Sequence, residues 1–238
     1  GTQRIVMTTA AIAVTGWALV AWPEAAPAPS GAPGRTAALF VPAESCVSCH
    51  TGLVTASGED VSFGAQWRGS MMAHSARDPY WQAGVRREVT DHPHARAQIE
   101  DECSACHMPM ARYHSKMAGQ EGEVFAYLPV GAARTLPARL AADGVSCTVC
   151  HQITPERFGG IASFGGGFVV DTTVPLGQRR IFGPYDVDRG RTRIMHSASG
   201  FVPAQAFHLG APELCATCHT LITTAFGPDG QVAGELPE

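Results

Sequence analysis

Four copies of one short pattern hold every cysteine of the chain. The copies read CVSCH, CSACH, CTVCH and CATCH, so two residues separate each pair of cysteines and a histidine follows at once. Their members are Cys46, Cys49 and His50; Cys103, Cys106 and His107; Cys147, Cys150 and His151; and Cys215, Cys218 and His219. On one helical turn, two thiols can bind a porphyrin through thioethers while the histidine ligates its iron, and this spacing is typical of c-type haem attachment. The pattern predicts four covalently bound haem c groups with those four histidines as proximal ligands.

Three other uses of paired cysteines fit the pattern less well. Zinc ribbons place two such pairs about 15 to 20 residues apart, whereas several dozen residues separate the copies in this chain. A thioredoxin-like redox motif normally occurs once. A disulfide framework, which suits exported chains, gives no reason for a histidine after every second cysteine.

The chain also contains more histidines than four proximal ligands require. Six others could bind the opposite, distal face of an iron, and methionine is an alternative ligand that raises the reduction potential. The preferred distal candidates are His208, His74, His196 and His114, and the alternatives are His92, His94, Met71 and Met72. An iron without a distal side chain could instead bind a small oxidant.

The N-terminal residues indicate the compartment. Residues 5–22 form an uncharged, mostly apolar run that is just long enough to span a bilayer, and Arg4 is the only charge before it. We expect residues 1–22 to form a transmembrane anchor, with a cleavable signal peptide as the alternative. Either interpretation exports the rest of the chain to the periplasmic side of the cytoplasmic membrane, where haem c is attached.

Composition changes after the apolar run. Residues 23–39 are rich in Pro and Ala and predict a semi-rigid linker. Residues 40–238 should then form a tetrahaem domain. The net charge of −4 gives no electrostatic basis for binding nucleic acid. Arg outnumbers Lys by 16 to one, and haem propionates would give the arginines carboxylate partners.

Local patterns predict a mainly α-helical domain with extensive loops. Asp78 and Pro79 are a helix N-cap and first-turn residue, and the stretch that ends at His107 should be a second helix. Pro203 and Pro212 could each start a short helix. The Gly-rich residues 157–200 suggest short strands or a small β-hairpin. Because no long amphipathic helix or strand series is evident, we expect the porphyrins to form much of the core.

The four motifs, together with Trp67 to His74, GVSCTVCH and the histidine shortly before ELCATCH, resemble the multihaem cytochrome c superfamily. Within it are the tetrahaem cytochrome of nitrifying bacteria and hydroxylamine oxidoreductase. The resemblance covers residues 42–220 and implies mostly bis-histidine haems in stacked pairs, with electron transfer as the common activity. No C-x-x-C-K occurs, so the lysine-ligated haem of pentahaem nitrite reductases is not represented. The sequence starts without Met and ends at GELPE, so an alternative interpretation is that the chain is a segment of a longer multihaem protein.

Three functional interpretations follow. The leading one is a membrane-tethered electron carrier that serves redox partner proteins, with a membrane complex among them. The second is an oxidoreductase with one open iron that acts on a small nitrogen or sulfur compound. The third is a haem-wire subunit of a larger assembly.

Overall fold

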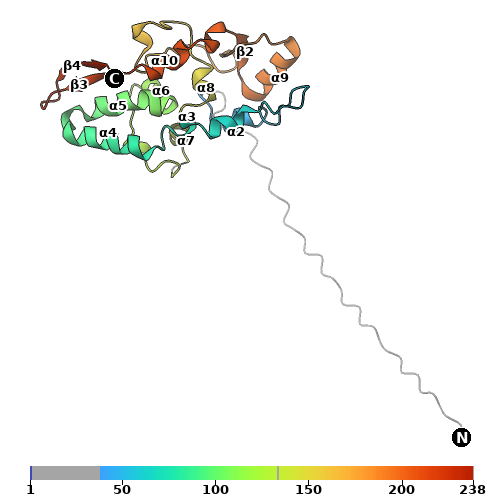
Figure 1. The fold of residues 1–238 in the computed structure, drawn as a ribbon, viewed down its shortest axis with the longest axis horizontal. Coiled ribbons are helices and arrows are strands. Elements are labelled where there is room, and N and C mark those ends of the chain that lie inside the picture. Colours follow the sequence, from blue (N-terminus) through green and yellow to red (C-terminus); the bar gives the residue numbers. More distant parts are fainter. Residues whose placement is uncertain (2–37, 133, 238) are drawn as a thin grey trace. The chain divides into compact units, whose positions relative to one another are not determined.

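A computed structural model describes residues 1, 38–132 and 134–237 (Figure 1). The chain divides into two units, residues 1–33 and 34–238, and every described element belongs to the second. The expected anchor, and the linker except for its last residues, lie outside the described residues. Within the described ranges, no helix has the length and apolar character needed to cross a membrane.

Short helices dominate the second unit. The α-helices are α1 (Glu44–Val47), α2 (Phe63–Arg68), α3 (Met71–His74), α4 (Pro79–Asp91), α5 (Arg96–His107), α6 (Pro109–Met117), α7 (Leu136–Ala142), α8 (Cys147–Cys150), α9 (Arg189–Ser199) and α10 (Glu213–His219). Single 3-10 turns form η1 (Pro93–Ala95), η2 (Phe125–Tyr127), η3 (Ile161–Ser163) and η4 (Phe207–Gly210). The strands are β1 (Arg180–Gly183), β2 (Val202–Gln205), β3 (Ile222–Phe226) and β4 (Val232–Pro237).

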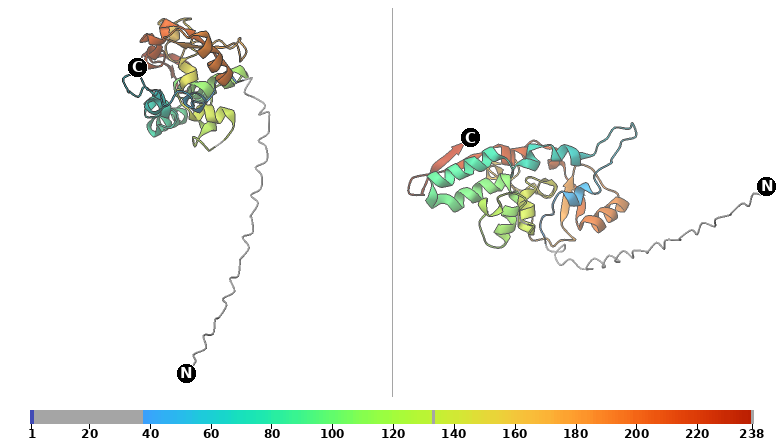
Figure 2. Two further views of the ribbon diagram at one scale, coloured as in Figure 1. Left: turned by 90° about the vertical axis from the view of Figure 1, so that its right-hand side faces the viewer. Right: turned by 90° about the horizontal axis from the view of Figure 1, so that it is seen from below.

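Helices α4 and α5 follow the sequence signals. The carboxylate of Asp78 accepts a hydrogen bond from the Tyr80 backbone N–H at 2.9 Å, and Pro79 occupies the first helical position, so the predicted start of α4 is confirmed. Helix α5 ends at His107, as predicted. The two helices lie side by side (Figures 1 and 2), and α5 presents the second cysteine motif at its C-terminal end.

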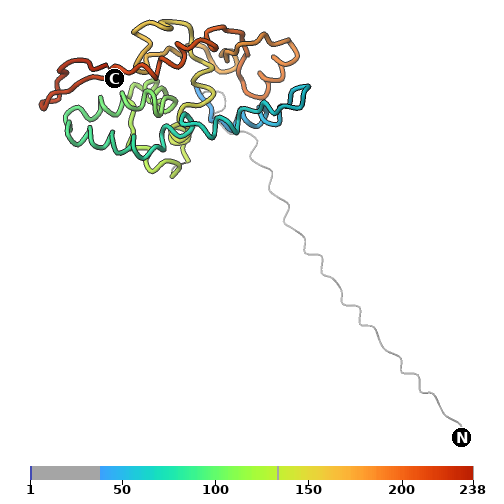
Figure 3. The backbone as a smooth tube through the Cα atoms, in the orientation of Figure 1, coloured from blue at the N-terminus to red at the C-terminus, as the bar shows by residue number. Residues whose placement is uncertain are grey.

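The strands differ from the expectation. Strand β1 confirms the expectation of a short strand within residues 157–200. It pairs in parallel with β2, with α9 as the crossover between them, so the alternative expectation of a hairpin in that range is wrong. Most of the backbone between α8 and β1 is irregular (Figure 3). The hairpin lies instead at β3 and β4, which pair antiparallel. Pro203 sits in β2 rather than starting a helix, while Pro212 is the N-cap of α10.

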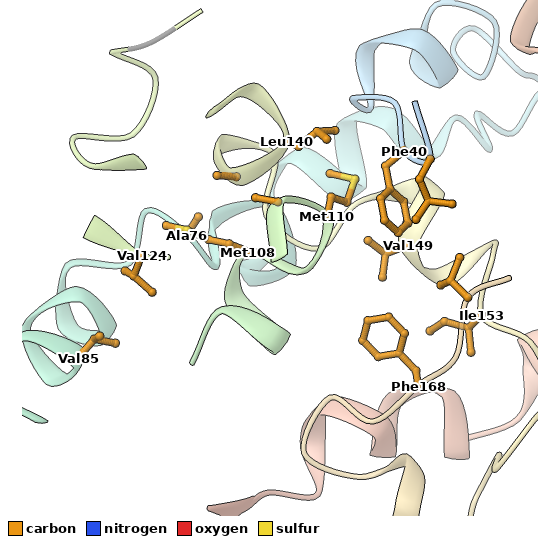
Figure 4. Close-up of a cluster of buried hydrophobic side chains, with 14 residues drawn as sticks. Phe40, Ala76, Val85, Met108, Met110, Val124, Leu140, Val149, Ile153 and Phe168 are labelled. Carbon is orange, nitrogen blue, oxygen red and sulfur yellow. The ribbon is translucent and has the colours of Figure 1, made fainter. Parts of the chain in front are cut away.

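The buried apolar core is an elongated cluster (Figure 4). Val85 and Val124 lie at one end of it, and Ile153 and Phe168 lie at the other. The Tyr113 ring connects segments at the second end, because it packs 5.7 Å from the Phe40 ring and 5.5 Å from the Phe168 ring between centroids. Its hydroxyl donates to the Phe168 carbonyl at 2.7 Å, which satisfies the phenol where it is half-buried.

Glu100 is a buried carboxylate that holds the segment before η2 against α5. Its side chain is 8% exposed and accepts hydrogen bonds from the backbone N–H groups of Val124 at 2.8 Å and Phe125 at 3.1 Å. Arg96, one helical turn earlier, donates to the other carboxylate oxygen at 2.7 Å. The charge is therefore satisfied on both oxygens, and this segment can pack beneath the helix.

Replacing Glu100 with Gln should destabilise the fold. The amide oxygen of Gln can still accept from the Val124 and Phe125 N–H groups, but its NH2 then faces the Arg96 guanidinium, donor against donor, and the charge that strengthened all three hydrogen bonds is lost. We therefore expect the free energy of unfolding to fall by about 2–4 kcal/mol. Urea denaturation measures it. The control is Glu121→Gln, which removes an exposed ion pair with Lys116 and should cost under about 1 kcal/mol. Equal losses in the two variants would show that Glu100 is not a buried anchor.

Candidate functional site

The four C-x-x-C-H motifs lie at helices or helix ends. Helices α5 and α10 contain the complete second and fourth motifs, α8 spans the cysteines of the third, and α1 carries Cys46 and ends just before the rest of the first. All eight cysteines are free thiols. Cys49 and Cys215 are exposed and the other six are half-buried. Each motif therefore presents two unpaired sulfurs within one or two turns of backbone, as covalent haem attachment requires.

The first and third motifs are neighbours in space. The thiols of Cys46 and Cys147 share a hydrogen bond, which lowers the pKa of Cys147 to about 7 and, with burial, raises the pKa of Cys46 far above its ordinary value. The two histidines also interact. Burial lowers the pKa of His50, and the charge of His151 lowers it further. Residues about a hundred positions apart in the sequence thus present their sulfurs and imidazoles to one another.

Hydrogen bonds from the segment before α1 produce this neighbourhood. The hydroxyl of Thr148, inside the third motif, donates to the Val41 carbonyl at 3.0 Å. Just after that motif, the Gln152 amide donates to the Leu39 carbonyl at 3.0 Å. Asp143 accepts from the backbone N–H of the residue before α1 at 2.8 Å. The acceptors at residues 39 and 41 are backbone groups, so no side-chain pattern at those two positions announces the contact.

The second and fourth motifs form another pair. A hydrogen bond between the thiols of Cys106 and Cys218 lowers the pKa of Cys106 and raises that of Cys218. Gly166 sits between the two helices. Its N–H donates to the Thr217 carbonyl at 2.7 Å, and a Cβ built on it would lie 2.7 Å from the Ala105 Cβ and 3.4 Å from the Cys106 Sγ. Only a residue without a side chain fits, and the Gly-Gly-Gly run at 165–167 is the sequence signal for such a close approach.

Electrostatic interactions link the two pairs. Burial raises the pKa of Cys150 to about 11, and negative charge on Cys147 and Cys215 contributes to the rise. Cys218, in turn, interacts electrostatically with Cys150. The third motif is therefore next to the fourth. In space, the four motifs follow one another in the order first, third, fourth, second.

The ring nitrogens of two motif histidines are oriented as metal ligands require. His107 Nδ1 lies 2.9 Å from the Ser75 carbonyl and His151 Nδ1 lies 2.5 Å from the Phe182 carbonyl. A carbonyl only accepts, so each Nδ1 carries the proton and Nε2 keeps its lone pair for a metal. Trp81 stacks on the His107 ring at 4.2 Å and 4°, which fixes its plane. No sequence pattern indicates that Ser75 and Phe182 supply these carbonyls, because any residue can supply one.

Burial favours the ligating form of His107. The half-buried environment lowers the pKa of this imidazole, although the hydrogen bond to Ser75 and the charge of Asp78 oppose the effect. His50 is shifted in the same direction. At neutral pH both rings are thus held neutral, which is the protonation state that binds a metal. The free thiols and the histidine tautomers fit the haem groups that the sequence predicts.

His208 lies between the third and fourth motifs. It belongs to η4, a few residues before α10, and its Nε2 is 2.8 Å from the Ile153 carbonyl, two residues after His151. The rings of Phe158 and Phe182 pack edge-on against it at 5.3 and 5.4 Å. This orientation leaves Nδ1 as the free nitrogen. The first choice for a distal ligand therefore lies beside two motifs, and its ligand role stays a prediction.

The remaining candidates near the second motif differ in exposure. His74 is exposed at the end of α3, directly before the Ser75 that bonds with His107. His114 is half-buried on α6, the helix that follows the second motif. Met71 and Met72 are 69% and 47% exposed on the same short helix as His74. The three candidates on α3 are thus exposed, and the one on α6 is partly covered.

His92 and His94 lie just before the start of α5, at the opposite end of that helix from its motif, and His196 lies on α9. His92 follows the last residue of α4, and its Nδ1 is buried without a hydrogen-bond partner among the described residues. An unpartnered buried imidazole nitrogen is uncommon and favours a ligand role for His92. His94 is exposed, and its backbone lies next to Gly230. His196 is also exposed, and its Nε2 is 2.8 Å from the Gly177 carbonyl. The structure does not bring these three together.

Large apolar side chains are exposed close to these histidines. Phe63 is 47% exposed and its ring lies 5.1 Å from that of His50. Phe207 is 82% exposed next to His208. Burying a side chain of this size is worth about 1.5–3 kcal/mol, so a flat apolar group covering each would be stabilising. Their position suits porphyrin faces.

No group of three His, Cys, Asp or Glu side chains in the described part of the chain is arranged to hold a metal ion by itself. In comparisons of sequence and structure, no protein-family model, no curated protein and no solved structure matches this chain.

Replacing Gly166 with Ala tests the contact between the second and fourth motifs. The residue has φ of +79° and the new methyl group would collide with Ala105, so the free energy of unfolding should fall by about 2–4 kcal/mol. Gly131→Ala is the matched control, because φ is +87° there but the space is open, and about 1 kcal/mol is expected. Denaturant melts of both variants give the difference. If Gly166→Ala cost no more than Gly131→Ala, the close approach would not exist.

Proposed function

We propose that this chain is a tetrahaem c-type cytochrome that relays electrons between redox partner proteins. One observation carries the proposal: four motifs scattered over residues 46–219 interact as a series in the order first, third, fourth, second, through thiol hydrogen bonds within the two pairs and through electrostatic interaction of Cys150 with the fourth motif. A structural or storage role for haem does not require each motif to lie near the next. A relay does, because electron transfer weakens steeply with distance.

Haem supplies an iron that gains and loses one electron reversibly while the porphyrin stays covalently fixed. The chain's own residues do the rest. Each thioether sulfur would be joined to its porphyrin edge through a single carbon atom. Cysteine sulfurs that lie close enough to share a hydrogen bond as free thiols would therefore hold two porphyrin edges close together once both motifs carry haem. Cys46 with Cys147, and Cys106 with Cys218, are such contacts.

The surroundings of each histidine would set the reduction potentials. Carbonyl acceptors on His107 and His151 raise the electron-donating power of their Nε2 atoms, and burial limits solvent at His50 and His107. His208 is the distal ligand best supported by its position, and its choice over a methionine would favour a lower potential. The resemblance to multihaem cytochromes points to the same activity.

The proposed location is the outer side of the cytoplasmic membrane, with residues 1–22 as the anchor. The apolar run at residues 5–22 and the requirement that haem c be attached outside the cytoplasm support it. A membrane redox complex would then be the nearest source or acceptor of electrons.

A haem count with a ligand-binding test separates a carrier from an enzyme. We expect the mass of the denatured, chelator-treated protein to include four haems, because thioethers survive where zinc would be lost. Carbon monoxide should leave the spectrum of the reduced protein unchanged, since every iron has two protein ligands. A haem-free mass would refute the cofactor assignment. A carbon monoxide difference spectrum of one haem would replace the carrier by an oxidoreductase with an open iron.

Variants that each lack one haem test the spatial order. Neighbouring ferric haems couple magnetically and alter each other's EPR signals. Removing the third haem by Cys147→Ser with Cys150→Ser should leave the first haem uncoupled, whereas Cys103→Ser with Cys106→Ser should not affect it. The variant Cys46→Ser with Cys49→Ser identifies the signal of the first haem. If that signal responded to loss of the second haem and not of the third, the proposed order would be wrong.

A further inference from the structure

A pocket beside the third motif is lined by polar side chains that have no role in the proposed electron relay. It has a volume of about 440 Å³ and is lined by residues that include Thr154, Asp171, Gln178, Arg179, Arg180 and Phe182. The carbonyl of Phe182 accepts the hydrogen bond of His151, so the pocket adjoins the proximal histidine of that motif.

Arg179 is a buried cation that has no carboxylate partner in the described ranges. Its residue is 6% exposed, Nε donates to the Val174 carbonyl at 2.6 Å, and one terminal nitrogen donates to the Ala38 carbonyl at 3.1 Å. Among the described residues, it forms no ion pair. Burial lowers the pKa of this guanidinium, and the charge of Asp171 offsets the effect only in part. Buried guanidinium groups normally pair with an anion, because burying a charge otherwise costs stability.

Asp171 does not take that role. Its Oδ1 accepts hydrogen bonds from the backbone N–H and the hydroxyl of Thr173, at 2.8 and 2.7 Å, and the residue is exposed at the pocket rim. Arg180 also lines the pocket. Two arginines against one aspartate leave the pocket with a net positive charge.

Thr154 provides a second, independent observation. Its hydroxyl oxygen is buried and has no hydrogen-bond partner in the described part of the chain. Such a hydroxyl costs stability unless a ligand occupies it. An unpaired cation and an unpaired donor therefore line the same cavity, and a carboxylate is the chemical group that satisfies both.

We propose that this pocket binds a carboxylate, anchored by Arg179 and by the hydroxyl of Thr154. Two sources supply this chemistry: a propionate of the haem attached at Cys147 and Cys150, or a small free carboxylate. The first source rests on the proposed function and the second does not. With a propionate bound, Arg179 would neutralise negative charge beside one iron and so raise its reduction potential.

The experiment is a redox titration of the full chain at fixed pH in the absence of added anions. If the propionate is the ligand, Arg179→Gln should shift the reduction equilibrium of one haem about tenfold towards the oxidised form, which is about 59 mV for one electron. Arg179→Lys, which keeps the charge but loses the planar fork, should recover part of the shift. Arg189→Gln removes an exposed charge on α9 and should leave every potential within a twofold change of its equilibrium constant.

Thr154→Val gives an answer that does not depend on how Arg179→Gln folds. If nothing binds in the pocket, removing an orphaned hydroxyl should leave the melting temperature unchanged or raised. If the hydroxyl donates to a haem propionate, the variant should melt at a lower temperature. It should also lower the reduction potential of the same haem that Arg179→Gln affects.

Acetate and succinate test the second source. For a free ligand, they should raise the melting temperature of the wild type saturably and lower the potential of the haem beside the pocket. Arg179→Gln should abolish both effects, and Thr154→Val should leave the anion-free potentials unchanged because it removes no charge. If acetate and succinate had no effect, and Thr154→Val was neutral or stabilising and shifted no potential, the carboxylate site would be overturned. A protein without covalent haem would refute the proposed function, and the acetate and succinate melts would still decide the pocket.

Discussion

The spatial arrangement of the four C-x-x-C-H motifs depends on hydrogen bonds that join motif helices to segments distant in the sequence. The carbonyls at Leu39 and Val41 accept from residues in and just after the third motif, and the Gly166 N–H donates into the fourth motif beside the second. Each of these bonds is modest in energy, about 0.5–1.5 kcal/mol net. Their importance is geometric, because they bring sulfur atoms from different motifs within reach of one another. Without them, the four motifs would be separate attachment points.

The helices that carry the motifs show why such links are necessary. Helices α1 and α8 have four residues each, far below the length of about 12–15 residues at which an isolated helix becomes even marginally stable in water. Tertiary contacts must therefore hold them. The apolar core supplies some, yet it runs as an elongated cluster, and side chains such as Phe63 and Phe207 remain outside it. A porphyrin bound at each motif would add the missing apolar surface.

The sequence predicted the residues of the motifs and the helices with strong end signals, but not their assembly. Asp78 and Pro79 set the start of α4 through local hydrogen bonding and a fixed backbone angle, so nearby residues sufficed. The pairing of the first motif with the third could not be predicted from the sequence, because the hydrogen bonds that hold it are accepted by the backbone carbonyls of Leu39 and Val41. The parallel pairing of β1 with β2 was missed for a related reason: the partner strand lies beyond α9, whereas a hairpin prediction considers only neighbouring segments. The orphaned nitrogen of His92 likewise appears only once its surroundings are known.

The two thiols of each pair differ in how readily they ionise. In each pair one thiol has its pKa lowered and the other has it raised, since a shared hydrogen bond stabilises only one of the two as the thiolate. Cys147 and Cys106 are the more nucleophilic members, because the thiolate is the reactive form. They belong to the third and second motifs, one in each pair. If haem attachment depends on thiolate character, the third motif should react before the first, and the second motif before the fourth. The porphyrin attached first would then help to orient the remaining thiol of each pair.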